Sequence, residues 1–139
     1  MKKIIKIGIP LCIFLLLLSG CRRDEAPQPT CRVVTGVDIS FRYEDMRLQR
    51  HYTDNKKVES VLLYLRLLKP LGKAYHAQEL PEEDLYEITV HLSDGSDRIY
   101  RQKAHRYFSR PERPWEQIDP GQASQLYQLM RHYPSDSTF

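Results

Sequence analysis

An alternation of apolar and polar residues along 33–43 constrains the fold of this chain more than any other feature. Val37, Ile39 and Phe41 stand at every second position, and polar or small residues lie between them. Successive side chains of a β-strand point to opposite faces of the sheet, so this period of two predicts a strand with one buried face. Residues 86–92 repeat the pattern. A sheet with a single apolar face must be covered on that face by other elements.

Turn signals extend these two strands into hairpins. A short acidic turn separates the first strand from a second one predicted over 46–52. Asp94-Gly95 is a strong hairpin signal after the strand at 86–92, because glycine tolerates the positive φ of a tight turn. The partner strand is predicted over 97–104, with an extension or a bulge through 107–108.

Two amphipathic helices follow the hairpins. The first is predicted near 55–68, where apolar residues recur at helical spacing after the helix-start signal Thr53-Asp54-Asn55. The second begins at Asp119, which fits an N-cap, and has Pro120 in its first turn. Gln122 occupies the position of the reciprocal partner in a capping box. A proline ends each helix.

The order of elements is strand, strand, helix, repeated once. It predicts an α+β fold in which a four-stranded antiparallel sheet carries two helices on one face, in ββα-ββα order. The stretches 70–84 and 109–117 are expected to be loops. In the first of these loops, the adjacent acids Glu82, Glu83 and Asp84 are expected to be solvated.

The first twenty residues have the order of a secretion signal. Lys2, Lys3 and Lys6 precede an apolar stretch over 7–18, and two small residues follow it. A membrane-spanning helix needs about 20 apolar residues, so this stretch is too short to span a bilayer. Residues 1–20 are therefore predicted to be a signal peptide.

The predicted signal ends at a cysteine. Leu18-Ser19-Gly20-Cys21 resembles the lipobox of bacterial lipoproteins. The resemblance covers residues 1–21, and it implies cleavage before Cys21 and a diacylglyceryl group on the thiol of that residue. Two acyl chains anchor a protein stably, whereas one holds it only marginally. The rest of the chain is broadly similar to small bacterial lipoproteins with no assigned activity.

The remainder divides into a lipidated tether over 21–30, a single domain over 31–134 and a disordered tail over 135–139. The chain has 21 Lys and Arg against 18 Asp and Glu, but three lysines lie in the signal, which leaves 18 of each sign. This balance gives no argument for a nucleic-acid partner. Cys31 is then the only free thiol, and a buried, inert cysteine is favoured over a reactive or intermolecularly paired one.

The sequence contains no catalytic or metal-binding motif. Five histidines occur, but no two have a zinc-type spacing, and no Cys-x-x-Cys pair is present. No Gly-x-Ser-x-Gly element and no Gly-rich phosphate loop occur either. The chain is therefore predicted to be non-enzymatic, without a cofactor or a metal. An envelope hydrolase is the least favoured alternative.

A basic and aromatic segment over 98–113, together with the only tryptophan, is the candidate binding surface. The residues singled out are Arg101, Arg106, Tyr107, Arg110 and Trp115. An anionic phospholipid, an anionic wall polymer or an envelope protein would suit this composition. The competing interpretations are a strand whose outer face is simply charged, and a tryptophan that covers the edge of the core.

These observations predict a lipoprotein held through Cys21 on the outer side of the cytoplasmic membrane. Arg22 permits sorting to an outer membrane where one exists, because an aspartate there would resemble an inner-membrane retention signal. The domain is predicted to be a binding module that uses the sheet face away from the helices, or the two Pro-rich loops. The alternative is an inhibitor or sensor of an envelope enzyme that recognises its target through Trp115 and 106–116.

Overall fold

The computed structural model describes residues 33–136. The predicted signal peptide, the lipidation site at Cys21, the tether and Cys31 lie outside these residues, as does the end of the predicted tail. In chain order the elements are β1 (Val34–Tyr43), β2 (Met46–Tyr52), α2 (Asn55–Leu67), β3 (Pro70–Tyr75), the 3-10 helix η1 (Ala77–Glu79), β4 (Leu85–Leu92), β5 (Asp97–Lys103), β6 (Tyr107–Ser109), β7 (Trp115–Ile118) and α3 (Pro120–His132).

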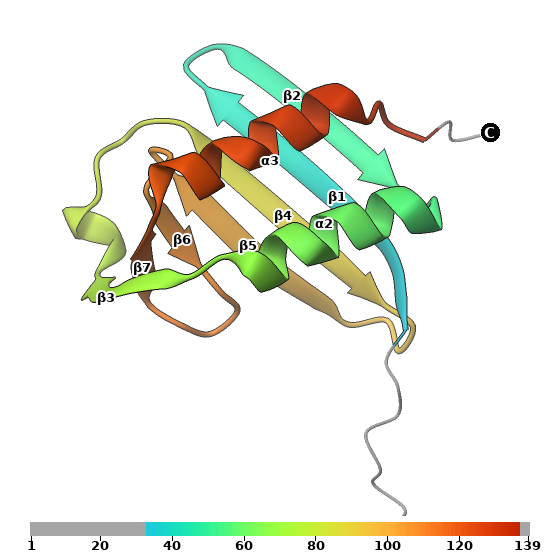
Figure 1. Ribbon diagram of the computed structural model, residues 1–139, viewed down its shortest axis with the longest axis horizontal. Helices are drawn as coiled ribbons and strands as arrows, with labels where there is room; N and C mark the ends of the chain where they lie inside the picture. Colours follow the sequence, from blue (N-terminus) through green and yellow to red (C-terminus); the bar gives the residue numbers. More distant parts are fainter. Residues whose placement is uncertain (1–32, 137–139) are drawn as a thin grey trace, which may run out of the picture. The chain divides into compact units, whose positions relative to one another are not determined.

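The strands form a seven-stranded antiparallel sheet in the order β2-β1-β4-β5-β6-β7-β3 (Figure 1). The predicted four-stranded sheet in ββα-ββα order was therefore wrong. The four expected strands, β2, β1, β4 and β5, are neighbours at one end of this order. Three more strands continue it beyond β5, and the prediction had placed β3 and β7 in loops and merged β6 with β5.

The missed strands are short and lack a local signal. Every residue of β3 is exposed except the half-buried Tyr75, so its sequence has no apolar alternation. Gly72 adopts a φ of +91°, and the pairing register with β7 shifts between Pro70 and Ala74. Such strands are formed by pairing with a neighbour rather than by their own periodicity.

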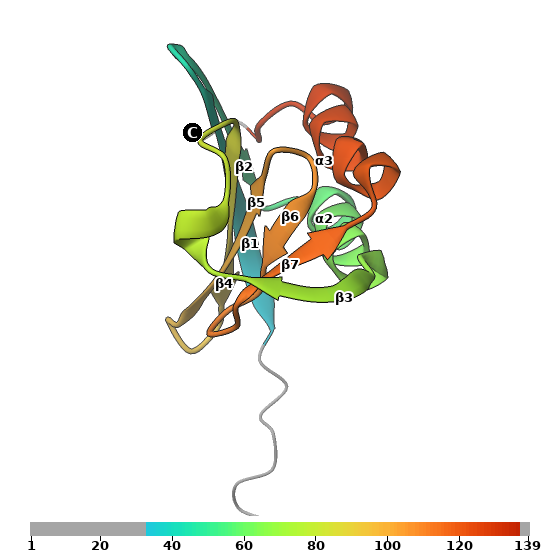
Figure 2. The same cartoon turned by 90° about the vertical axis from the view of Figure 1, so that its left-hand side faces the viewer.

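Both helices pack on the same face of the sheet (Figure 2). Val37, Ile39 and Ile88 point to this face and are buried with Val61 of α2 and Leu126 of α3. Burying one such side chain fully contributes about 1.5–3 kcal/mol relative to leaving it exposed. Neither α2 nor α3 lies on the opposite face of the sheet.

Each helix begins where the sequence predicted it, α2 within the start signal at 53–55 and α3 after the predicted N-cap Asp119. The Asp54 carboxylate accepts hydrogen bonds from two backbone N–H groups of α2, at 3.1 and 3.2 Å, and the Asp119 carboxylate accepts one from Gln122 N at 3.1 Å. The Gln122 side chain does not complete a capping box. Instead it accepts from Lys69 N at 3.3 Å and donates to Leu67 O at 3.2 Å, so it ties the start of α3 to the end of α2.

A buried polar network joins both helices to the sheet. Gln102 of β5 is fully buried. Its side-chain oxygen accepts a hydrogen bond from the Tyr64 hydroxyl of α2, and its nitrogen donates to Ala123 O of α3 at 2.9 Å. The amide thus forms hydrogen bonds with both helices, as a buried polar group requires.

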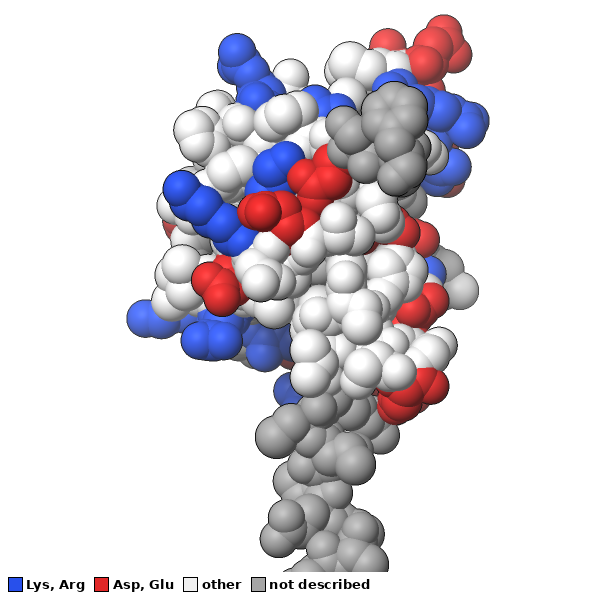
Figure 3. All heavy atoms as spheres, turned by 90° about the vertical axis from the view of Figure 1, so that its right-hand side faces the viewer, with Lys and Arg blue, Asp and Glu red and all other residues white. Residues whose placement is uncertain are grey.

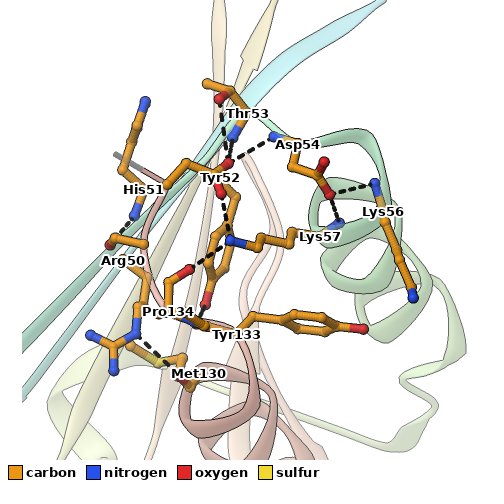
Figure 4. Close-up of polar contacts among 12 residues, drawn as sticks. Arg50, His51, Tyr52, Thr53, Asp54, Lys56, Lys57, Met130, Tyr133 and Pro134 are labelled. Carbon is orange, nitrogen blue, oxygen red and sulfur yellow. Dashed lines mark hydrogen bonds and ion pairs between the residues drawn. The ribbon is translucent and has the colours of Figure 1, made fainter. Parts of the chain in front are cut away.

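The chain after α3 folds back onto the start of α2 (Figure 4). Asp136 Oδ2 accepts hydrogen bonds from Thr53 N at 2.6 Å and Asp54 N at 2.8 Å, and Oδ1 lies 2.5 Å from Lys57 Nζ. Ser135 Oγ accepts a hydrogen bond from the β2 backbone. The sequence had assigned both residues to the disordered tail. Figure 3 shows acidic and basic side chains next to one another on this end of the domain.

Candidate binding site on the open face of the sheet

Three strands present one row of side chains to the face that the helices leave open. Arg101 of β5 pairs with Ser109 of β6, which pairs with Trp115 of β7. The neighbouring residues Gln102 and Phe108 are buried on the helix side. Because side chains alternate along a strand, Arg101, Ser109 and Trp115 point away from the helices.

A shallow cavity of about 600 Å³ lies over this row. Its lining residues are Asp97, Ile99, Arg101, Ser109, Arg110, Pro111, Glu112, Arg113 and Trp115. Three arginines and one tryptophan therefore border the same concave surface. Arginine binds carboxylates and phosphates through two parallel hydrogen bonds, and tryptophan is enriched where proteins bind partners.

The structure brings together three of the five residues predicted to form the binding surface. Arg101, Arg110 and Trp115 line the cavity. Tyr107 lies two residues before Ser109 in β6, on the same face of the sheet, and does not line the cavity. Arg106 belongs to the turn between β5 and β6, where it is exposed and also outside the cavity.

Trp115 is the first residue of β7, and not part of a loop as expected. It is half-buried and pairs with Tyr75 of β3. The Tyr75 ring lies 5.2 Å from that of Tyr107, in an edge-to-face arrangement, and its hydroxyl donates to Gln117 Oε1 at 3.2 Å. Tyr75 of β3 thus contacts both β6 and β7 next to Trp115.

The three arginines of the cavity differ in what holds them. Arg101 Nε lies 3.3 Å from Glu87 Oε2 in an exposed ion pair, which binds weakly. Arg110 donates to Leu68 O at 3.0 Å, beside the end of α2. The Arg113 side chain makes no hydrogen bond or ion pair with the described residues. Arg113 lies in the basic segment but was not among the predicted binding residues, and it is the cation freest to meet a ligand.

Two histidines and two aspartates alternate across the same face, beside the cavity. His51 Nδ1 contacts one carboxylate oxygen of Asp38. His91 Nε2 lies 2.6 Å from the other oxygen of Asp38, and His91 Nδ1 lies 2.7 Å from Asp97 Oδ1. A neutral imidazole has a single N–H, so His91 can donate to both carboxylates only as an imidazolium.

The contacts between these histidines and aspartates shift the pKa values of His91 and Asp38. Hydrogen bonds to Asp38 and then to Asp97 raise the pKa of His91 above its usual value, against the effect of partial burial. Burial alone would raise the pKa of Asp38, but its hydrogen bonds to His51 and His91 outweigh burial and lower that pKa. Both shifts favour the charged forms, the imidazolium of His91 and the carboxylate of Asp38.

The sequence pattern showed only that no two histidines have a zinc-type spacing. The alternation in β1 and β4 does place Asp38 and His91 on the outward face, so a signal existed. Their contact depends on strand register, which pairs Asp38 with His51 and His91 with Asp97. No group of three His, Cys, Asp or Glu side chains within residues 33–136 could hold a metal ion.

Comparisons of the chain with protein-family models, with curated proteins and with solved structures return no match. Within the part of the chain that the structure describes, no helix is long and apolar enough to cross a membrane.

Proposed function

We propose that this protein is a lipoprotein, anchored through Cys21 on the outer side of the cytoplasmic membrane, whose domain is a non-enzymatic binding module. The support for the anchor is the N-terminal order of charge, apolar stretch and lipobox-like cysteine. The partner in this proposal is anionic and belongs to the cell envelope, either an acidic segment of a protein or an anionic polymer.

One observation carries the binding proposal. Arg101, Arg113 and Trp115 line a single cavity on the sheet face that lies away from α2 and α3. Guanidinium groups supply paired donors to an acidic group, and the indole supplies a rigid surface to pack against. Asp97 and Glu112 also border the cavity, so acidic side chains lie among its arginines.

The test compares two double substitutions that remove the same charge. The full chain, purified in detergent and immobilised, is exposed to envelope extract and to polyglutamate as a defined polyanion. We expect Arg101→Ala/Arg113→Ala to weaken polyglutamate binding at least about tenfold. The control Arg42→Ala/Arg47→Ala removes two arginines that do not line this cavity. Equal losses in both variants, or no enrichment by the wild type, would refute the proposal.

Trp115 carries the second candidate, an inhibitor or sensor of an envelope enzyme. Its indole borders the cavity next to the Pro111 loop, as a recognition residue for a protein target would. Truncating a dominant residue of a protein interface costs at least about 2 kcal/mol of binding free energy. If Trp115→Ala changes target binding by less than about 1 kcal/mol, this second candidate fails.

A hydrolase receives little support from the cavity. Ser109 supplies its lining hydroxyl, which lies 3.4 Å from Arg110 O and 3.3 Å from Arg113 O. No histidine lines the cavity. A serine nucleophile needs a base within hydrogen-bond reach, so this arrangement favours binding over catalysis.

A further inference from the structure

A second cavity lies at the other face of the sheet, where β1 ends and β4 begins. It has a volume of about 270 Å³ and is lined by Phe41, Tyr43, Glu83, Asp84 and His105. The Phe41 ring points to the helix side, 6.2 Å from the Tyr127 ring of α3. This cavity is therefore separate from the one bordered by Trp115, and none of its lining residues is shared with it.

Asp84 is buried beside this cavity, contrary to the solvated position expected from the sequence. Only 4% of the residue is exposed, and its Oδ2 atom accepts no hydrogen bond from the described residues. His105 Nε2 lies 3.0 Å from this oxygen, within ion-pair distance, but makes no hydrogen bond to it. A buried carboxylate is costly unless it is both paired and hydrogen-bonded, and beyond its contact with His105 this oxygen can still accept a hydrogen bond.

A second buried polar atom lies close to the first in sequence. Tyr86, the next residue of β4 that faces the helices, is fully buried, and its hydroxyl also has no hydrogen-bond partner within residues 33–136. The β5–β6 turn covers this end of β4, because Ala104 N donates to Asp84 O at 3.3 Å. Two unsatisfied polar atoms two residues apart mark this end of β4 as a polar site within an apolar core.

The walls of the cavity suit a cation. Phe41 and Tyr43 present aromatic rings, whose faces attract ammonium and guanidinium groups. Glu83 adds an exposed carboxylate to the lining, and no Lys or Arg is among the lining residues. The negative charge of the site is therefore not balanced by a lysine or an arginine of its own.

We propose that this cavity binds a single cationic group, the ammonium or guanidinium end of an amine. Asp84 pairs with the cation, Glu83 attracts it from the exposed side, and Phe41 and Tyr43 pack against its carbon chain. The volume is below the range of about 300–1,000 Å³ that holds drug-sized ligands, so the site fits one side-chain-sized group. The source is a lysine or arginine of a partner protein, or a free alkylamine. This proposal is independent of the anionic partner of the other face.

Calorimetry and NMR titration of the full chain in detergent test the proposal. The probes are n-butylammonium and n-butylguanidinium, a glycine-flanked peptide with one lysine, and n-butanol as an uncharged mimic. We expect the cations to bind saturably and to shift the signals of Tyr43 and His105, whereas n-butanol binds far more weakly. Tighter binding of the peptide identifies a partner protein as the source, and equal binding identifies a free amine. Both of these results support the site.

Substitutions locate the site. Asp84→Asn should weaken n-butylammonium binding at least about tenfold, because it removes the charge that the cation meets. Glu83→Gln should weaken it by a smaller factor, since that carboxylate is exposed. The matched control is Glu82→Gln, which removes the same charge from an exposed residue that does not line the cavity. Thermal melting verifies that each variant is folded. If Asp84→Asn does not fold, Glu83→Gln serves as the test.

Three results would overturn the proposal. The first is the absence of saturable binding of either cation up to about 10 mM. The second is an equal loss of binding in the Glu82→Gln control and in the cavity variants. The third is that n-butylammonium binds the His105→Gln variant but not the wild type. This result would show that His105 already serves as the partner of Asp84 in the native chain.

Discussion

One buried polar residue, Gln102, forms hydrogen bonds with both helices and so helps to fix their positions on the sheet. Gln102 is surrounded by core side chains, and its amide group is bonded to α2 through Tyr64 and to α3 through Ala123. Burial raises the pKa of Tyr64 well above its usual value, so its hydroxyl remains protonated and donates at any physiological pH. The pair therefore positions both helices on the sheet by hydrogen bonds that an apolar pair could not provide.

Removing the Tyr64 hydroxyl tests this arrangement. Tyr64→Phe leaves the side-chain oxygen of Gln102 buried without a donor, and we expect the free energy of unfolding to fall by about 1–3 kcal/mol. Urea denaturation measures the change. Tyr100→Phe is the control, because the Tyr100 hydroxyl makes no hydrogen bond with the described residues and its ring is only half-buried. Equal effects of the two substitutions would mean that the Tyr64 hydroxyl does not matter.

His91 gives the open face a dependence on pH. Because its folded pKa is raised above the unfolded value of about 6.5, its ion pairs contribute in full below that pH. The contribution is lost as the pH rises through the higher folded pKa. We expect it to be under about 1 kcal/mol, since the pairs are partly exposed. Between pH 6 and 9, His91→Gln should flatten the pH dependence of unfolding measured by urea denaturation.

His132→Gln is the matched control for this titration. His132 lies on α3 and forms no ion pair with a carboxylate of the described residues. Its substitution should leave the slope of stability against pH as it is in the wild type. An unchanged slope in His91→Gln would contradict the imidazolium assigned from the two contacts of its ring.

At the scale of elements, the segment after α3 acts as a clasp between the two helices. Asp136 contacts Lys57 in the first turn of α2 and accepts hydrogen bonds from the backbone just before it. The Tyr52 hydroxyl donates to Tyr133 O at 2.7 Å and fastens the same segment to β2 (Figure 4). The end of α3 is thereby held close to the start of α2.

Asp136→Asn should open this clasp. The hydrogen bond to Lys57 and those from Asp54 N and Thr53 N lower the pKa of Asp136 well below its usual 3.8. Its stabilising contribution is therefore complete above that value and is lost as the pH falls through the lower folded pKa. We expect a lower midpoint of urea unfolding at pH 7 and faster amide exchange at Thr53. The two proteins should converge at strongly acidic pH, and a constant difference down to acidic pH would contradict the assignment.

For the molecule as a whole, the proposed anchor and the domain are expected to be separable. Cys21 precedes a polar stretch with two prolines and lies outside every periodic element of the sequence. The core that the structure describes is made of residues within 33–136. Membrane attachment and folding should therefore respond to different substitutions.

Cys21→Ser should abolish lipid labelling and membrane retention and leave the fold unchanged. Labelling of cells with a fatty-acid analogue, followed by detergent partition, measures the first effect, and circular dichroism measures the second. Cys31→Ser is the control, and it should keep its label. Retention of label in Cys21→Ser would show that the N-terminal cysteine is not the site of lipid attachment.

Local chemistry determined those features of this protein that need no distant partner. The alternation in β1 and β4, the turn at Asp94-Gly95 and the N-caps at Asp54 and Asp119 depend on neighbours within a few residues, so the sequence alone indicated them. Side-chain periodicity also placed Arg101 and His91 on an outward face. The grouping of arginines and tryptophan was only a compositional hint until strand register aligned Arg101, Ser109 and Trp115.

Only the tertiary structure decided which segments join the sheet and which charges are buried. β3 and β7 have no apolar alternation and exist because each completes the hydrogen bonds of the other. Asp84 lies among acids that look solvated, yet the β5–β6 turn and Phe41 enclose it. Pairing between distant strands has no signature in the local sequence, because it depends on which backbone edges remain unpaired once the helices have packed. For this reason both proposed binding sites became visible only in three dimensions.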